Sequence, residues 1–520
     1  MCTSRKGVVP PIVLSLVTVA LALAVTLANP TTAAASQARK RPAAPPAPAK
    51  PKPAFELKAL SATRSEVKLS WAANAPKVAA FVVERQSGRI PFAEITKVTA
   101  TEASDSKIDP YATYVYRVRV AEAQTFSNEV TVGPPPAGFN VAAGAPQDRH
   151  NDYGLQISLA LDSNDDPIIA YVFDDPNKDS NRDDTQLFFL SWDRAQYRWK
   201  QPVLADTTGQ IDNNTGQIQV SLARDASNNL LGIAYQKGED IWLALSSDGG
   251  ATWSTEAVLR GDNLEAGVPS LGMAGGKIHV AYFLHAEGVR YVTRVGASGR
   301  FESSLAPVLT NTIASRNQPP SLALDAEGKP GLAYWLQSEQ GYNVTLAFWR
   351  PGTHTAFKVI DSSGFQNDTP AVSLAFHGSQ PRVGVRIIRV KDGFDDDLWA
   401  TASPDGQAWS EPVQVPRDGG HGWDNPISLA VDSKGRGALA VTSLHGVPAP
   451  KPPACGLPKL ARSSDFEQWT TCSPDTNKTL SITAWHPSIV FAGNDKLYLA
   501  FRNNDSDSKV GVGVVLWREP

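Results

Sequence analysis

The sequence has few cysteines, which excludes a fold stapled by many disulfides. Only 3 occur in 520 residues. Cys2 precedes an N-terminal apolar run, which leaves Cys455 and Cys472 as an even pair. In an exported protein such a pair predicts one disulfide. A metal pair is the alternative, but no histidine lies within a few residues of either cysteine and two ligands make a poor zinc site.

The sequence also lacks a second apolar run long enough to cross a membrane. The one run present, Ile12 to Ala28, follows Arg5 and Lys6 and leads to the small residues Ala33 to Ala35. A charged start, an apolar stretch and a small-residue cleavage site are typical of a secretory signal peptide. We therefore expect residues 1–35 to be a signal peptide cleaved after Ala35, with a membrane anchor as the alternative. The mature chain is then secreted or attached to the cell surface, with no transmembrane span.

Acidic residues are missing from the first 53 residues, which contain seven basic ones. Residues 36–53, rich in Ala, Pro and Lys, predict a stiff, solvated linker. The rest of the chain holds 42 of the 49 basic residues against all 52 acidic ones. This acidic balance argues against nucleic acid as a partner.

Short alternating strands fill residues 54–133 and predict a small sandwich domain of seven strands. One stretch places Val67, Leu69 and Trp71 on one face, and "ATYVYRVRV" alternates from Tyr114 onward. These stretches, with "FVVERQSG" and "SNEVTV", resemble a fibronectin type III domain. The resemblance implies a spacer or adhesion module in which Tyr114 is the tyrosine-corner residue. The "GRIP" stretch at 88–91 looks like a sialidase arginine motif, but its position in a sandwich hairpin indicates a turn.

A unit of about 50 to 60 residues repeats seven times from residue 134 to 520. Each unit carries a Ser-Leu or Ser-Ile pair, a turn, and further apolar strands; the serines are Ser158, Ser221, Ser270, Ser321, Ser373, Ser428 and Ser488. Four short strands per unit are typical of a β-propeller blade. The last unit has only three strands, so we expect residues 138–144 to supply the fourth and close the ring. The expected fold class is all-β, a sandwich followed by a seven-bladed propeller.

The stretch "SSDGGATW" matches the Asp-box of sialidase-like (BNR) propellers, with weaker copies at "ASPDGQAW" and "ARSSDFEQW". The resemblance implies that these segments stabilise hairpins between third and fourth strands, on the face away from the functional site. The residues concerned are Ser246, Asp248, Gly250, Thr252, Trp253, Asp405, Trp409, Asp465 and Trp469.

Ligands of propellers usually bind at the mouth formed by the loops between blades and those joining second to third strands. There we expect aromatic side chains to stack on a sugar ring and arginines to bind an anionic group of the ligand. The expected ligand site consists of Asp368, Trp423, Asp424, Trp485 and His486, with Arg389 and Arg502 nearby. Each carboxylate has an alternative role in solvating a loop or capping a turn, and the tryptophans have one in packing.

Three functions fit this pattern. The first is a binding module for an extracellular glycan or protein. The second is a sialidase-like exo-glycosidase, in which the candidate catalytic residues are Arg316, Arg389, Arg502, Asp152 and Tyr342 or Tyr153. No family motif fixes these residues, and that family is mostly six-bladed. The third is a calcium-dependent structural protein, suggested by oxygen-rich stretches at 174–184 and 502–508 that lack EF-hand spacing; otherwise no cofactor is expected.

Overall fold

The computed structural model of the protein describes residues 53–72, 80–144, 152–174, 185–207, 211, 220–259, 266–284, 287–310, 312–314, 319–338, 344–362, 371–389, 395–416, 427–441, 459–472, 484–503 and 513–520. All regular structure in these residues is β-strand, which confirms the all-β prediction. None of them forms a helix that could span a bilayer. The expected signal peptide lies outside these ranges, as does the linker apart from Pro53.

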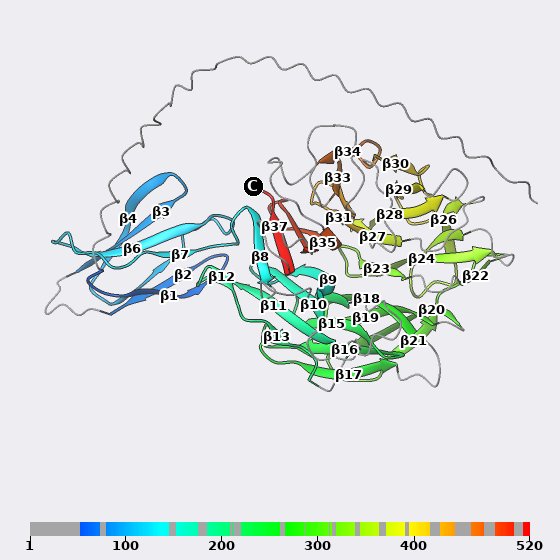
Figure 1. The fold of residues 1–520 in the computed structure, drawn as a ribbon, viewed down its shortest axis with the longest axis horizontal. Helices are drawn as coiled ribbons and strands as arrows, with labels where there is room; N and C mark the ends of the chain where they lie inside the picture. Colours follow the sequence, from blue (N-terminus) through cyan, green and yellow to red (C-terminus); the bar gives the residue numbers. More distant parts are fainter. Residues whose placement is uncertain are drawn as a thin grey trace, which may run out of the picture. The chain divides into compact units, whose positions relative to one another are not determined.

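The first seven strands form a two-sheet sandwich (Figure 1). One sheet has the order β1 (Leu57–Ala62), β2 (Val67–Trp71), β5 (Glu102–Asp105), and the other has the order β4 (Ile90–Val98), β3 (Phe81–Ser87), β6 (Tyr114–Val120), β7 (Val130–Val132). Alternate residues face inward because side chains alternate along a strand; Val67, Leu69, Trp71, Tyr114 and Tyr116 lie in one buried cluster.

Two details of the sandwich agree with the roles predicted from the sequence for Tyr114 and for the "GRIP" stretch. The Tyr114 hydroxyl accepts a hydrogen bond from the backbone N–H of Asp109 at 2.7 Å, the geometry of a tyrosine corner. The "GRIP" segment forms the β3–β4 hairpin turn, with Gly88 at φ +55°, which confirms its role as a turn. Membership of the fibronectin type III family stays a prediction.

The described residues from Gly138 onward form seven further sheets, which we call blades 1 to 7 in chain order. Blade 1 contains β9 (Asp152–Leu161), β10 (Pro167–Asp174), β11 (Gln186–Asp193), β12 (Arg198–Trp199) and β13 (Val203–Leu204). Blade 2 contains β14 (Val220–Arg224), β15 (Leu231–Lys237), β16 (Asp240–Ser246) and β17 (Ser254–Leu259). Blade 3 contains β18 (Ala266–Ala274), β19 (Lys277–Leu284), β20 (Gly288–Val295) and β21 (Glu302–Leu305).

Blades 4 to 7 continue the pattern. Blade 4 contains β22 (Thr312–Ala314), β23 (Ser321–Leu324), β24 (Pro330–Ser338), β25 (Val344–Trp349) and β26 (Ala356–Ser362). Blade 5 contains β27 (Ala371–His377), β28 (Gln380–Arg389), β29 (Asp395–Ala402) and β30 (Val413–Val415). Blade 6 contains β31 (Ile427–Val431), β32 (Gly437–Val441), β33 (Lys459–Ser463) and β34 (Trp469–Cys472). Blade 7 contains β35 (Ala484–Phe491), β36 (Leu497–Asn503), β37 (Gly513–Arg518) and β8 (Gly138–Gly144).

The ring closes through β8, as predicted. This strand precedes blade 1 in the sequence but pairs antiparallel with β37 near the C-terminus (Figure 1). It covers the edge that β37 would otherwise expose, and an exposed edge strand invites pairing with other chains. The first strands of blades 7 and 1 are also in contact, so the ring has seven blades.

The repeated serines link neighbouring blades. Each hydroxyl accepts a hydrogen bond at 2.9 to 3.1 Å from the backbone N–H of the residue after the serine in the next blade. The last of these bonds runs from Leu159 of blade 1 to Ser488 of blade 7. First strands have one unpaired edge, so the bonds satisfy donors that the blade's own ladder leaves free.

The sandwich is fixed to the propeller by several polar contacts. Arg194 binds Asp166 through two nitrogens at 2.7 and 2.8 Å and also donates to the Pro110 carbonyl. Arg64 donates to Asp165 at 2.7 Å, and both side chains bond the Tyr111 hydroxyl. The propeller residues in these contacts lie in turns of blade 1, at the start of β10 and the end of β11.

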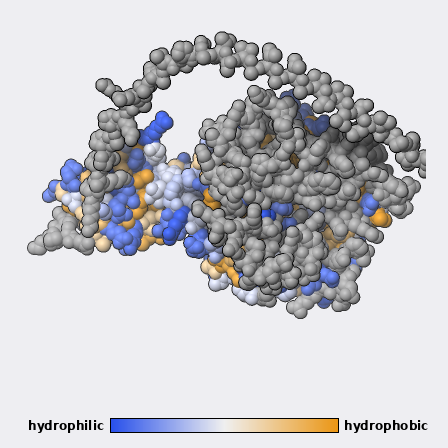
Figure 2. Space-filling view, viewed as in Figure 1, coloured by the Kyte–Doolittle hydropathy of each residue, from blue (hydrophilic) through white to orange (hydrophobic). Residues whose placement is uncertain are grey.

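Hydrophilic and hydrophobic residues are interspersed over the described surface that faces the viewer in Figure 2. Isolated apolar side chains are exposed, such as Leu60 and Ile90 of the sandwich and Val295 of blade 3. Scattered exposed apolar residues are normal for a folded surface. Polar chemistry is therefore the better guide to a functional site.

Candidate functional site

The two ends of the ring can be told apart from the strand ladders. In blade 2, Lys237 at the end of the second strand pairs with Asp240 at the start of the third, whereas Leu231 and Ser246 pair at the opposite end. We call the end at which first strands begin the mouth rim. The other end, which carries the turns between third and fourth strands, is the Asp-box rim.

The three motifs that resemble an Asp-box lie in turns between third and fourth strands, and they organise those turns. In blade 2 the Asp248 carboxylate accepts from the Ser246 hydroxyl and from the Thr252 N–H and hydroxyl, at 2.6 to 2.9 Å. The bonds from Thr252, chiefly that of its hydroxyl, lower the pKa of Asp248 to about 2. Trp253 donates its indole N–H to the Gly250 carbonyl. These groups are occupied by local hydrogen bonds, so this motif supports a structural role.

The two weaker copies fold in the same way. Asp405 accepts from the N–H groups of Gln407 and Ala408 in blade 5, and Asp465 accepts from those of Glu467 and Gln468 in blade 6. Their aromatic residues Trp409 and Trp469 pack on neighbouring rings. The structural role predicted for the three motifs is consistent with this geometry.

The structure places several of the predicted residues at the mouth rim, in blades 1, 5 and 7. Asp152 pairs with Asp174 in blade 1, Arg389 with Asp395 in blade 5, and Trp485 with Arg502 in blade 7. Tyr153 is next to Asp152 and pairs with Phe173. These backbone positions share one rim.

Several of these residues lie in strands and not in loops, which corrects the prediction. Asp152 begins β9, Trp485 and His486 lie in β35, and Arg502 lies in β36. The first strand extends beyond the repeat serine toward the mouth because the ladder contains a bulge, which lies between Trp485 and Ser488 in blade 7. Bulges bend a strand and redirect its side chains, so they recur beside functional sites.

Six predicted residues lie outside the described ranges. They are Arg316, Tyr342, Asp368, Trp423, Asp424 and Cys455. The disulfide between Cys455 and Cys472 therefore stays a prediction, although Cys472 is placed at the end of β34. The oxygen-rich stretches proposed for calcium also fall mostly outside, and the described residues contain no group of three or more potential metal ligands.

His486 has the most unusual local geometry in this part of the mouth rim. Its φ is +49°, in the left-handed region, which residues other than glycine seldom adopt, although asparagine, aspartate and histidine do so more often than the rest. The side chain is half-buried, and burial, with a smaller contribution from the Arg502 charge, lowers the pKa of His486 to about 4. The imidazole is therefore neutral near pH 7, beside a buried arginine that is 7% exposed.

A second buried arginine, Arg386, was missed by sequence reasoning. Arg386 in blade 5 and Arg502 in blade 7 occupy equivalent positions in their second strands. Each lies two residues after the residue, Gly384 or Ala500, that pairs with the centre of the third strand. Arg386 is 4% exposed. The sequence signal that could have identified Arg386 is the shared order of a small residue, an apolar residue and an arginine. It reads Gly-Val-Arg in blade 5 and Ala-Phe-Arg in blade 7. Arg389, selected instead, is three residues nearer the end of the same strand.

No protein-family model and no curated protein matches this sequence. Solved structures with a similar fold include a Dyadobacter fermentans protein of unknown function, at 12% identity and TM-score 0.42, covering 73% of this chain and 96% of that one. The NanB sialidase of Streptococcus pneumoniae has 11% identity and TM-score 0.39, covering 90% and 92%. A leech intramolecular trans-sialidase has 10% identity and TM-score 0.38, covering 89% and 90%. At these values the likeness carries no conclusion about activity.

Proposed function

We propose that the protein is an exported binding module that recognises a glycan at the mouth rim of its propeller. The observation that carries the proposal is the cluster in blade 7: His486 at positive φ, next to Trp485, across the ladder from the buried Arg502. A non-glycine residue held in this region costs on the order of 1–3 kcal/mol, and such residues cluster at ligand sites as well as in turns; His486 lies within a strand and not in a turn.

The chemistry of this cluster suits a sugar. A neutral imidazole can donate one hydrogen bond and accept another, and a tryptophan provides a flat apolar surface for a sugar ring. An arginine can hold a carboxylate through two parallel hydrogen bonds. Export is proposed from the N-terminal pattern, and mass spectrometry of the secreted protein should find Ser36 at its N-terminus.

A sialidase-like exo-glycosidase is the second candidate. It is favoured by the two buried arginines, Arg386 and Arg502, in equivalent strands of blades 5 and 7. Buried guanidinium groups at a ligand site suit the carboxylate of an acidic sugar. A calcium ion bound by the oxygen-rich stretches at 174–184 and 502–508 stays a proposal from the sequence.

The test combines a glycan array with a panel of fluorogenic glycosides, using the full mature chain. Binding without turnover supports the binding module, and turnover supports the hydrolase. Arg502→Lys keeps the charge but removes the bidentate geometry, so it should weaken binding or turnover of an acidic sugar by about tenfold or more. Arg198→Lys, an exposed position at the other end of blade 1, is the matched control. Neither binding nor turnover on any glycan would contradict both candidates.

A further inference from the structure

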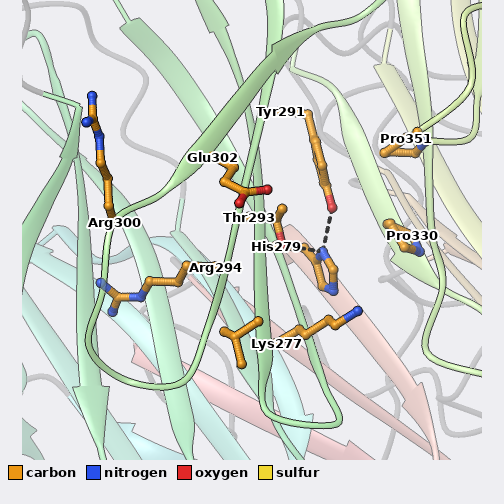
Figure 3. A pocket seen from close by; sticks show the side chains of 11 residues that line it. Lys277, His279, Tyr291, Thr293, Arg294, Arg300, Glu302, Pro330 and Pro351 are labelled. Atoms are coloured by element: carbon orange, nitrogen blue, oxygen red, sulfur yellow. Dashed lines mark hydrogen bonds between the residues drawn. The ribbon is translucent and has the colours of Figure 1, made fainter.

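A pocket opens on the Asp-box rim, at the opposite end of the ring from the mouth. It has a volume of about 570 Å³ and lies between blade 3 and blade 4 (Figure 3). Blade 3 contributes Lys277, His279, Tyr291 and Glu302, and blade 4 contributes Pro330 and Pro351. The volume falls in the range of small-molecule sites.

The pocket exists because blade 4 has no Asp-box. In blade 4, Phe348 of the third strand pairs with Phe357 of the fourth, and the connection between these two residues contains eight residues. In blades 2 and 5, where an Asp-box is present, twelve residues separate the corresponding pairs, Leu243–Glu256 and Ala400–Val413. The shorter turn leaves uncovered a space that an Asp-box would fill.

Tyr291 occupies the position that an Asp-box covers elsewhere. It pairs with Ala281, as Phe189 pairs with Ala170 in blade 1 and Phe348 with Ala333 in blade 4. The following blade covers those two phenylalanines: Trp253 packs on Phe189 and Trp409 on Phe348, with ring centroids 5.1 and 5.4 Å apart. In blade 3 the corresponding ring bears a hydroxyl and lines the pocket.

The floor of the pocket is a histidine with an unused ring nitrogen. His279 is 4% exposed, and its Nδ1 lies 2.6 Å from the Tyr291 hydroxyl and 3.2 Å from that of Thr293. Its Nε2 is buried and has no hydrogen-bond partner among the described residues. Burial lowers the pKa of His279 to about 4, so the ring is neutral near pH 7. An unsatisfied buried polar atom calls for an explanation, and a bound water or ligand is one that fits an atom beside a pocket.

The exposed groups around the floor provide both a donor and an acceptor. Lys277 and Glu302 form no ion pair with any described residue, whereas Arg294 is held by Glu256 of blade 2. Figure 3 shows the Lys277 side chain next to His279, and Glu302 next to Thr293, its partner in the ladder. Arg300 also lines the pocket, so two cationic side chains and one carboxylate, all unpaired among the described residues, line it together with the imidazole. These donors and this acceptor suit a molecule rich in hydroxyls, which can both accept and donate hydrogen bonds.

We propose that this pocket is a binding site for a neutral sugar ring, the size of one hexose or N-acetylhexosamine. His279 Nε2 and Lys277 contact ring hydroxyls as hydrogen-bond partners, Glu302 accepts hydrogen bonds from others, and the proline rings provide apolar contact. The proposal does not rest on the mouth rim, because the two sites lie at opposite ends of the ring and share no residue.

The experiment is saturation-transfer NMR on the full mature chain with four free sugars at millimolar concentration: D-galactose, D-mannose, L-fucose and N-acetyl-D-glucosamine. The test variant is Lys277→Ala/Glu302→Ala, which changes two exposed side chains and conserves net charge. The control is Lys200→Ala/Glu411→Ala, which removes the same two side-chain types at exposed positions in blades 1 and 5. A third variant, His279→Phe, is compared with the wild type by thermal unfolding as well as by NMR.

We expect at least one sugar to bind the wild type and the control, and binding to weaken by about tenfold or more in the test variant. His279→Phe should abolish binding, and it is informative only if its melting temperature shows a folded protein. The proposal is overturned if none of the four sugars binds, or if binding is unchanged in the test variant. Binding lost in Arg502→Lys but retained in the test variant would contradict this pocket and leave the mouth-rim proposal standing.

Discussion

At the scale of single residues, the clearest feature is that the Asp-box turns and the blade before them share one space. Where the turn has a small residue the preceding blade has a large one, and the reverse. In blades 2 and 5 the turn has a glycine, Gly250 or Gly406, at positive φ. A Cβ on Gly250 would lie 2.0 Å from the Phe189 ring. In blade 6 the equivalent residue is Phe466, also at positive φ, and the preceding blade has Ala400 in place of the phenylalanine. Ala400 and Phe466 share one buried cluster.

This exchange predicts a coupled pair of substitutions. Ala400→Phe should destabilise the protein by about 1–3 kcal/mol, because a second large ring would enter a filled space. Phe466→Gly alone should cost about 3 kcal/mol or more through the cavity it leaves. The double variant recreates the arrangement of blades 2 and 5, so it should be more stable than the sum of the two single effects predicts. Urea unfolding of the four proteins measures this difference.

Additive effects in that cycle would show that the two side chains do not share a space.

Gly250→Ala provides an independent check, because both the backbone conformation and the Phe189 ring oppose a side chain there. It should cost on the order of 1–3 kcal/mol. Gly238→Ala is the matched control: its φ is also positive, but nothing lies within 4 Å of the added Cβ.

The buried histidine His279 predicts loss of stability in mild acid. Its folded-state pKa of about 4 is below the unfolded value of about 6.5, so the unfolded state binds the proton first. Its contribution to stability is present above about pH 6.5 and is lost as the pH falls toward 4, by up to about 3 kcal/mol. Replacing His279 with Gln should flatten this part of the pH profile of unfolding. A profile with the same slope in the variant would contradict the prediction.

At the scale of strands, the first strand of each blade carries both the structural and the functional features of the repeat. Its serine bonds the next blade, and in blades 1, 3 and 7 the ladder of this strand contains a bulge on the mouth side of the serine. The regular part of the strand builds the ring, and the part beyond the bulge extends to the mouth rim in these three blades.

The hydrogen bonds that the repeat serines accept from neighbouring blades should each add a small amount to the free energy of unfolding. Ser221→Ala should cost about 1 kcal/mol, since the Leu271 N–H loses its partner at 2.9 Å. Ser379→Ala is the control, because that side chain is exposed and makes no described bond between blades. Thermal unfolding compares the two. Equal melting temperatures would mean that water replaces the hydroxyl without cost.

At the scale of the whole molecule, the propeller depends on a strand from outside its repeats. Strand β8 supplies Ala142 and Ala143 to one buried cluster and the Phe139 ring to another. The polar contacts with the sandwich fall on turns of blade 1 at the Asp-box end, so in the described residues they leave the mouth rim uncovered.

Truncation tests the closure of the ring. A chain that starts at residue 134 keeps β8, whereas one that starts at residue 146 loses it and exposes the edge of β37. The shorter chain should lose roughly 3 kcal/mol of apolar burial and become prone to aggregation. Thermal unfolding and light scattering of both chains measure the difference. A shorter chain as stable as the longer one would show that β8 does not close the ring.

The repeat pattern by itself determined the number of blades, the turns and the strand that closes the ring. Ser-Leu pairs recur because each blade must satisfy the same free edge, and Asp-box residues recur because the same turn needs the same caps. Both constraints are local and repeat in every blade, so they are visible in sequence. The alternation of apolar residues that predicts the sandwich is visible for the same reason.

Only the tertiary structure decided which polar residues meet. Arg386 and Arg502 share a strand position that is recognised once the blades are aligned by register, and His486 was assigned to a loop because a bulge has no reliable sequence pattern. The pocket at His279 depends on the length of a turn in the next blade and on the tyrosine that blade 3 has at the position of Phe189 and Phe348. Such features arise from contacts between distant segments, because space is filled or left open only when the ring has closed.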